Sequence, residues 1–166
     1  MLLRLPLIRN LVQDYRPEGV RMPEIRESET VPYTAPQMFR LIADVDRYKE
    51  FLPWCTDSHI ISQDEDDAWV TEIQVGYGAF HTGFTTRNTH VVNRKIKMDL
   101  VDGPFKFLRG SWHFDPIEGN GCRMCLNLNF EFAGHLLDKL FNNVFETAMN
   151  SLVQAFKDRA KKRYDA

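Results

Sequence analysis

The sequence contains no uninterrupted run of about 18 apolar residues, so it predicts no membrane-spanning helix. It also lacks an excess of positive charge, because 21 Lys and Arg stand against 23 Asp and Glu and give a net charge of -2. This balance argues against a dedicated nucleic-acid-binding protein and leaves room only for local contact. Cysteine is scarce, with three in 166 residues. A chain of this length can fold as one domain without disulfides, so we interpret all three as thiols in a reducing compartment such as the cytoplasm.

Motifs for nucleophilic or metal chemistry are missing as well. The five histidines are scattered, and Gly110-Ser111-Trp112 lacks the second glycine of a nucleophile elbow. Cys122 and Cys125 form a C-x-x-C, but they fall in a strictly alternating segment, where residues three apart point to opposite faces of a strand. The sequence therefore predicts neither a metal site nor covalent catalysis.

The first 23 residues differ from the rest of the chain. They hold four arginines and two acids, and none of the twelve phenylalanines lies before Phe39. Their apolar opening is broken by Arg4 and Pro6, and no small-residue cleavage site follows, which disfavours a secretory signal. We expect residues 1–23 to be an appendage, either a targeting segment or the stretch before an alternative start at Met22.

Residues 24–164 have the pattern of a single α+β domain. A short strand is predicted from Ile25 to Val31, and Thr34 is expected to cap a helix that has Pro36 in its first turn. A second short helix is predicted from Arg47 to about Leu52. Six segments with strand character follow, at about 57–62, 68–75, 79–91, 95–101, 107–114 and 122–132.

A long helix is predicted from Gly134 to about Arg163, and its apolar residues form two rows. The first row is Leu137, Phe141, Val144, Ala148, Leu152 and Ala155, and the second is Leu136, Leu140, Phe145, Met149, Val153 and Phe156. The sheet has one apolar face and the helix has a wide apolar stripe, and each needs a partner. We therefore expect a curved antiparallel sheet wrapped around the helix.

Several segments together resemble a known family. They are Val31-Pro32-Tyr33-Thr34, Ala43-Asp44-Val45, Arg47-Tyr48, Phe51-Leu52-Pro53-Trp54-Cys55, Val101-Asp102-Gly103-Pro104-Phe105-Lys106, Trp112-His113-Phe114 and Phe156-Lys157-Asp158-Arg159-Ala160. In this order they resemble the coenzyme Q-binding START-domain family of the polyketide cyclase-like superfamily, over about Glu24 to Tyr164. The resemblance implies a helix-grip fold, in which seven antiparallel strands grip the C-terminal helix around a hydrophobic tunnel for a polyisoprenoid quinone. Bacterial members of the family include a ribosome association toxin.

A single sheet face seldom covers two apolar rows of a helix, so we expect part of this surface to line a cavity. The candidate ligand-binding residues are Phe51, Trp54, Phe84, Phe105, Leu108, Trp112, Leu128, Phe130, Phe141, Phe145, Met149 and Leu152. Asn88 and His90 share strand parity with Phe80 and Phe84, which makes them candidate polar residues of the cavity. A β-bulge would instead turn Arg87 inward.

Two further segments have two interpretations each. The Phe51 to Trp54 loop either dips into a membrane surface beside the tunnel or plugs the core. The cations at the end of the long helix either complement the helix macrodipole or contact ribosomal RNA. These cations are Lys157, Arg159, Lys161, Lys162 and Arg163.

From the sequence we expect a binding protein without a covalent cofactor. The favoured role is a carrier or chaperone for ubiquinone, or a similar isoprenoid lipid, in respiratory electron transport. Such a protein would lie in the cytoplasm, peripherally at the inner membrane, or on the matrix side of a mitochondrial membrane. Two alternatives stay open: a protein that binds the large ribosomal subunit and interferes with subunit association, and an aromatase/cyclase-like enzyme.

Overall fold

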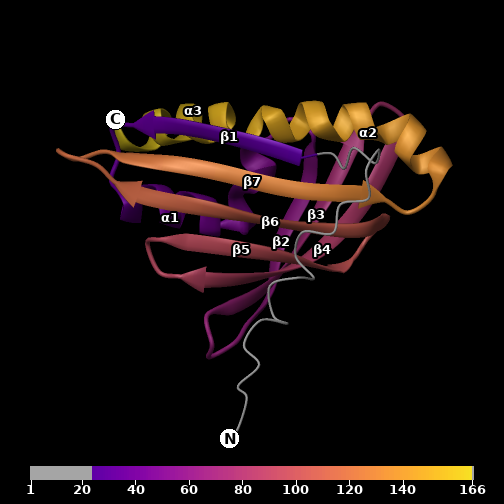
Figure 1. The fold of residues 1–166 in the computed structure, drawn as a ribbon, viewed down its shortest axis with the longest axis horizontal. Coiled ribbons are helices and arrows are strands. Elements are labelled where there is room, and N and C mark those ends of the chain that lie inside the picture. Colours follow the sequence, from indigo (N-terminus) through magenta and orange to yellow (C-terminus); the bar gives the residue numbers. More distant parts are fainter. Residues whose placement is uncertain (1–23, 166) are drawn as a thin grey trace, which may run out of the picture.

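The computed structural model describes residues 24–165, so the appendage expected at residues 1–23 lies outside the described part. Seven antiparallel strands form one sheet in the order β1-β7-β6-β5-β4-β3-β2 (Figure 1). The strands are β1 (Glu24–Val31), β2 (Cys55–Gln63), β3 (Ala68–Tyr77), β4 (Phe80–Val91), β5 (Lys95–Asp102), β6 (Phe105–Pro116) and β7 (Cys122–Phe132). The helices are α1 (Ala35–Ala43), the 3-10 helix η1 (Val45–Glu50), α2 (His135–Asn150) and α3 (Leu152–Tyr164). The predicted curved sheet around a C-terminal helix is confirmed.

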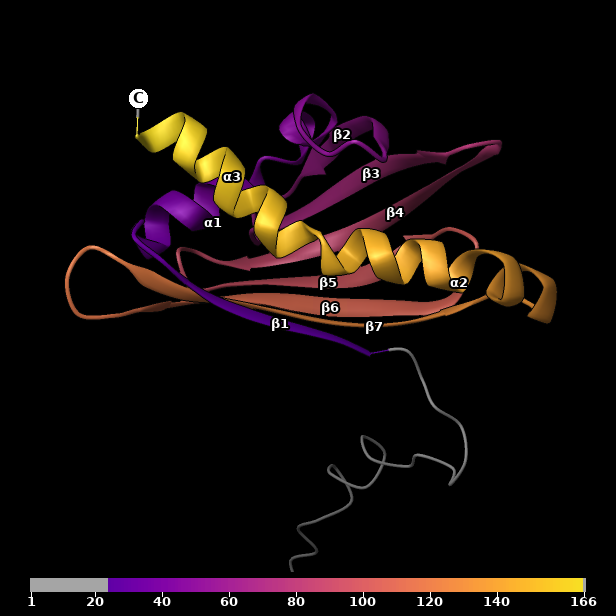
Figure 2. The same ribbon diagram turned by 90° about the horizontal axis from the view of Figure 1, so that it is seen from above.

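The core lies between one face of the sheet and the C-terminal helices, which run across that face (Figure 2). Strand β7 supplies six buried side chains at alternate positions, as its pattern predicts. They are Cys122, Met124, Leu126, Leu128, Phe130 and Phe132. Cys125, three residues after Cys122, is only partly buried, and its Sγ lies 3.3 Å from the Ser28 Oγ. No helix within residues 24–165 is long and apolar enough to cross a membrane.

The C-terminal helix, which the sequence predicts as continuous, bends at Ser151 (Figure 2). The Ser151 hydroxyl donates a 2.6 Å hydrogen bond to the Ala148 carbonyl oxygen, and such side-chain bonds within a helix compete with its ladder and bend it. The apolar stripe is also narrower than predicted, because Leu136 and Leu140 are 71% and 55% exposed. Only part of the second row therefore packs on the sheet.

Helix α1 begins with a capping box. The Thr34 Oγ1 accepts a 3.2 Å hydrogen bond from the Gln37 backbone N–H, and the Gln37 Oε1 accepts one of 2.8 Å from the Thr34 N–H. We expect Thr34→Ala to lower the free energy of unfolding by about 1 kcal/mol, because the helix loses a partner for an otherwise unpaired N–H. Urea denaturation measures this loss. Thr34→Ser, which keeps the hydroxyl, should stay near wild type, and an equal loss in both variants would contradict the capping role.

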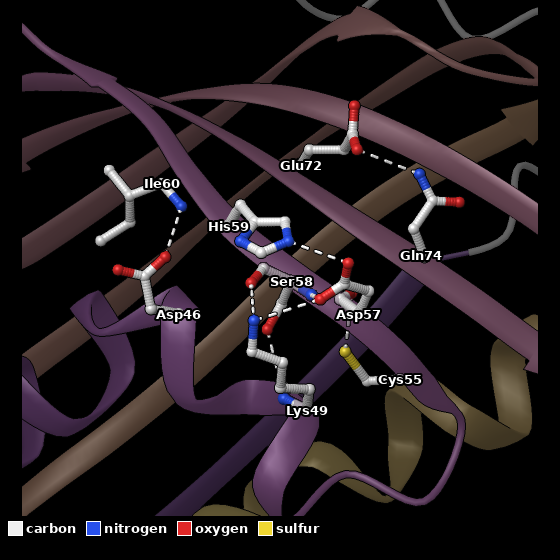
Figure 3. Close-up of polar contacts among 9 residues, drawn as sticks. All are labelled: Asp46, Lys49, Cys55, Asp57, Ser58, His59, Ile60, Glu72 and Gln74. Atoms are coloured by element: carbon white, nitrogen blue, oxygen red, sulfur yellow. Dashed lines mark hydrogen bonds and ion pairs between the residues drawn. The ribbon is translucent and has the colours of Figure 1, made fainter.

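The second short helix starts two residues earlier than predicted, because the Arg47 N–H already bonds to the Asp44 carbonyl. Side chains of this 3-10 helix form hydrogen bonds with the edge strand β2 (Figure 3). The Asp46 Oδ1 accepts a 2.7 Å bond from the Ile60 N–H, and the Lys49 ammonium donates to the Ser58 carbonyl and the Asp57 carboxylate, each at 3.1 Å. The bonds to the Ile60 N–H and the Ser58 carbonyl satisfy backbone groups of an edge strand that would otherwise be open to pairing with another chain.

Asp57 is the centre of the same cluster (Figure 3). Its Oδ2 lies 2.8 Å from the His59 Nε2, and this hydrogen bond, followed by the one from Lys49, lowers the pKa of the Asp57 carboxyl. Asp57 therefore stays charged at neutral pH and holds Lys49 in place. The cluster fixes η1 and the loop after it against the sheet, which positions the aromatic residues that follow.

Candidate functional site

Two small cavities lie between the inner sheet face and the C-terminal helices. The larger has a volume of about 60 Å³ and is lined by Val45, Tyr48, Trp54, Thr71, Ile73, Phe84, Thr86, Asn88, Met98, Leu108, Trp112, Leu126, Leu128, Phe145, Met149, Leu152 and Phe156. The smaller has a volume of about 10 Å³ and is lined by Trp54, Val75, Tyr77, Phe80, Thr82, Phe84, Phe105, Phe132, Phe141, Val144, Phe145, Ala148 and Met149. Four side chains line both cavities: Trp54, Phe84, Phe145 and Met149.

A closed hydrogen-bonded cluster supplies the polar part of the larger cavity. The Thr86 hydroxyl donates to the Asn88 Oδ1 at 2.8 Å, the Asn88 Nδ2 donates to the Thr71 Oγ1 at 3.3 Å, and the two hydroxyls lie 3.2 Å apart. All three side chains are buried. The Trp54 Nε1, also buried, has no partner within residues 24–165. The larger cavity is therefore mainly apolar with a few polar side chains in its wall, an arrangement suited to a mainly apolar molecule.

Ten of the predicted ligand-binding residues line one or both cavities: Trp54, Phe84, Phe105, Leu108, Trp112, Leu128, Phe141, Phe145, Met149 and Leu152. Phe130 lines neither, because it is fully buried among other aromatic rings, with its ring centroid 4.6 Å from that of Phe145. Phe51 lines neither because it packs beside Tyr48 and Phe156. Sequence reasoning missed Thr71 and Thr86, although Thr86 lies between Phe84 and Asn88 on the inner face of β4.

The three predicted polar cavity residues on β4 differ in where their side chains lie. Asn88 lines the larger cavity, whereas Arg87 points to the outer side, where its Nη2 donates to the Asp64 carboxylate at 3.0 Å. The β-bulge that would turn Arg87 inward is absent from β4. The pairing of β4 with β5 does contain a bulge, but its extra residue, Val101, belongs to β5. His90 is buried on the inner face but lines neither cavity. Its ring packs edge-on against Trp69, with centroids 4.4 Å apart.

Burial lowers the pKa of the His90 imidazole, although the charge of Asp67 opposes the shift. The unfolded chain, in which a histidine has a pKa near 6.5, therefore binds a proton before the folded one does. We expect the free energy of unfolding to fall as the pH drops below about 6.5 toward the native pKa. Urea titrations at several pH values measure this dependence. In His90→Leu this part of the slope should disappear, and identical slopes in both proteins would contradict the assignment.

The loop from Phe51 to Trp54 belongs to the core. Leu52 and Trp54 are buried, and Phe51 is partly buried beneath the guanidinium of Arg159, which lies 5.0 Å from its ring centroid. These contacts agree with the interpretation that the loop plugs the core between η1 and the sheet.

The predicted basic residues at the end of α3 divide into two groups. Lys157 pairs with Glu29 at 3.2 Å and Arg159 pairs with Glu50 at 2.6 Å. Lys161, Lys162 and Arg163 form no ion pair with any residue of 24–165. Of these five, Arg159, Lys162 and Arg163 line an open groove together with Asp44 and Arg47, which we call the basic groove. Arg47 was not among the predicted contacts.

The titratable side chains of the described residues lie mostly away from the two cavities. No group of three or more His, Cys, Asp or Glu in the described part of the chain is arranged to hold a metal ion. Among residues 24–165, neither cavity is lined by a carboxylate, histidine, lysine or cysteine. The buried Tyr48 hydroxyl donates to the Ile42 carbonyl, and burial raises its pKa, so it stays protonated.

Comparison with known proteins gives a family match and several similar proteins. Residues 31–157 match the family model described as polyketide cyclase/dehydrase and lipid transport. The chain is 41% identical to the ribosome association toxin RatA of Escherichia coli over 145 residues, which are 87% of this chain and 91% of that protein. It is 27% identical to the mitochondrial coenzyme Q-binding protein COQ10 homolog B of Xenopus laevis, over 88% of this chain and 61% of that protein.

A solved structure with the same fold is the Zhui aromatase/cyclase of Streptomyces sp. R1128. It superposes with a TM-score of 0.74 over 86% of this chain and 96% of that one. The two sequences are 17% identical, so the likeness concerns the fold alone.

Proposed function

We propose that this chain, which belongs to the polyketide cyclase/dehydrase and lipid transport family, binds the large ribosomal subunit and interferes with subunit association. The observation that carries the proposal is the local positive charge at the end of α3. There Lys161, Lys162 and Arg163 are exposed and form no ion pair within residues 24–165, on a chain with a net charge of -2. The relationship to RatA over most of both chains supports it.

The size of the interior favours this surface function over storage of a large ligand. Ligand sites usually have volumes of about 300–1,000 Å³, whereas the larger cavity has about 60 Å³. A cavity of that size holds a few water molecules, so a quinone with its tail would have to displace core side chains. Binding to RNA needs no such rearrangement.

Sedimentation with ribosomes tests the proposal. At low salt we expect the purified protein to sediment with isolated large subunits, and to lower the fraction of assembled ribosomes when both subunits are mixed. Binding should weaken steeply as salt rises, because each neutralised phosphate releases counterions. Absence of the protein from the large-subunit fraction at low salt would overturn the proposal.

Binding of ubiquinone or a similar isoprenoid lipid is the second candidate, with a carrier role in respiratory electron transport and transient contact with a membrane surface. It is favoured by the two adjoining apolar cavities and by the unpartnered, buried Nε1 of Trp54, a residue that lines both of them. The relationship to the coenzyme Q-binding protein supports it. Extraction of the purified protein with organic solvent, followed by mass spectrometry, tests it: a co-purifying quinone supports the candidate, and its absence from protein made in quinone-rich cells counts against it.

In either role we propose a binding protein and not an enzyme. General acid–base catalysis needs a titratable group in contact with the substrate. In the described part of the chain, the only titratable side chains that line the cavities are the tyrosines Tyr48 and Tyr77. Tyr48 is held by the Ile42 carbonyl, and Tyr77 is mostly exposed at the end of β3. An aromatase/cyclase-like turnover by the purified protein would contradict this proposal.

A further inference from the structure

The basic groove gathers cations from two elements that are distant in sequence. Arg47 comes from η1, and Arg159, Lys162 and Arg163 come from α3. The groove has a volume of about 360 Å³, and Asp44 is the one carboxylate among the described residues that line it. All five lining residues are charged, and four of them are positive.

Two of the arginines are held in place before any ligand binds. The two oxygens of Glu50 accept one hydrogen bond each, at 2.7 Å from the Arg47 Nη1 and at 2.6 Å from the Arg159 Nη2. The hydrogen bond from Arg47 is the main cause of the lowered pKa of Glu50, so Glu50 remains an anion that orients both side chains. A guanidinium has five N–H donors, and one of each arginine is used by Glu50, so both side chains retain further donors. An oriented guanidinium also loses less conformational freedom on binding than a lysine does.

We propose that the basic groove is the site at which this protein holds the sugar–phosphate backbone of RNA. The inference rests on the proposed ribosome association and specifies its contact surface. Guanidinium forks match phosphate oxygens, and contact with the backbone alone reads no sequence. A membrane surface fits less well, because interfacial binding needs apolar side chains and no described residue of the groove is apolar.

The groove assigns different roles to neighbouring cations on α3. Lys162 lines it, whereas Lys161 and Lys157 do not, and Lys157 is paired with Glu29. A general attraction between the positive helix end and RNA would treat Lys161 and Lys162 alike, since both are exposed lysines that form no ion pair within residues 24–165. This pair therefore offers a matched test.

The test compares Lys162→Gln with Lys161→Gln in the full chain, by salt-dependent co-sedimentation with large ribosomal subunits. With four cations on the phosphate backbone, raising the salt from 50 to 200 mM should weaken wild-type binding about 50- to 150-fold. Lys162→Gln should reduce the slope of log affinity against log salt by about 0.7–0.9, and Arg47→Gln/Lys162→Gln by about twice that. Lys161→Gln should keep the wild-type slope. Equal slopes for the two single variants would contradict the proposal that the basic groove is the RNA-binding site, but not the proposed ribosome association.

A second variant is expected to bind RNA more tightly than wild type. Such a gain in affinity cannot be explained by misfolding, whereas a loss of binding could be. Asp44 lines the groove, and its side chain makes no capping hydrogen bond to η1. Asp44→Asn removes a repulsive charge and should tighten binding about two- to fivefold at low salt. Unchanged or weaker binding would contradict the proposal.

Parallel measurements separate the groove from the proposed function. Fluorescence anisotropy measures the affinity of each variant for a single-stranded RNA oligonucleotide in the absence of ribosomes. If wild type binds this RNA with the predicted ranking of variants but does not sediment with subunits, the groove stands and the ribosome role falls. If the ranking instead appears only with vesicles of phosphatidylcholine and phosphatidylglycerol, RNA is the wrong occupant and the inference is overturned.

Discussion

Phe130→Ala is expected to lower the free energy of unfolding by about 3–5 kcal/mol, the range found when large buried aromatic residues are truncated. Phe130 is 0% exposed, and its ring packs edge-on against Phe105, Phe132 and Phe145, with centroids 6.4, 6.0 and 4.6 Å away. Truncation removes contacts with all three rings and leaves a hole that the rigid strands cannot close. Urea denaturation at neutral pH measures the loss.

Phe107→Ala is the matched control, because Phe107 is only partly buried on the neighbouring strand β6. Its loss should be clearly smaller than that of Phe130→Ala. A loss below about 1 kcal/mol in Phe130→Ala would mean that this side chain faces a cavity and not a packed core, since a residue beside open space has fewer contacts to lose.

The contrast between Phe130 and Leu128 shows how far strand alternation predicts the site. Both residues belong to the inward-facing set of β7, and the sequence places both on the correct face. Period-two alternation defines the face but not the depth of packing, which depends on the facing helix. Leu128 lies opposite Gly110 in the sheet and lines the larger cavity, whereas Phe130 is covered by Phe145.

The bend at Ser151 and the basic groove could not be read from the sequence for a different reason. The apolar pattern with a period of 3.6 residues continues through Ser151, whereas in the structure α2 ends at Asn150 and α3 begins at Leu152. Arg47 and Arg159 are brought together by the packing of η1 beside α3, through their common partner Glu50. A charge run such as residues 157–163 predicts a basic surface, but tertiary contacts decide which of its members act together.

Leu128→Trp is expected to separate the two proposed functions. Its larger ring must enter the cavity of about 60 Å³ that also borders Trp112 and Met149. Overpacking of this kind usually costs about 1–3 kcal/mol, so the protein should still fold. If the interior holds a quinone, its affinity should grow with tail length, because each buried methylene contributes about 0.8 kcal/mol.

We therefore expect Leu128→Trp to weaken binding of a long-tailed ubiquinone at least tenfold, while co-sedimentation with large subunits stays at the wild-type level, because Leu128 does not line the basic groove. Quenching of tryptophan fluorescence by quinones of different tail lengths measures the quinone affinity, with Leu128→Met as the volume-conserving control.

Lys162→Gln should show the opposite pattern, with normal quinone binding and a reduced slope of log affinity against log salt on large subunits. Wild-type quinone affinity in a correctly folded Leu128→Trp protein would remove the interior from the ligand argument. Loss of both activities in that variant would instead mean that the cavity and the groove are coupled through α3, whose first residue, Leu152, lines the cavity and whose last turns line the groove.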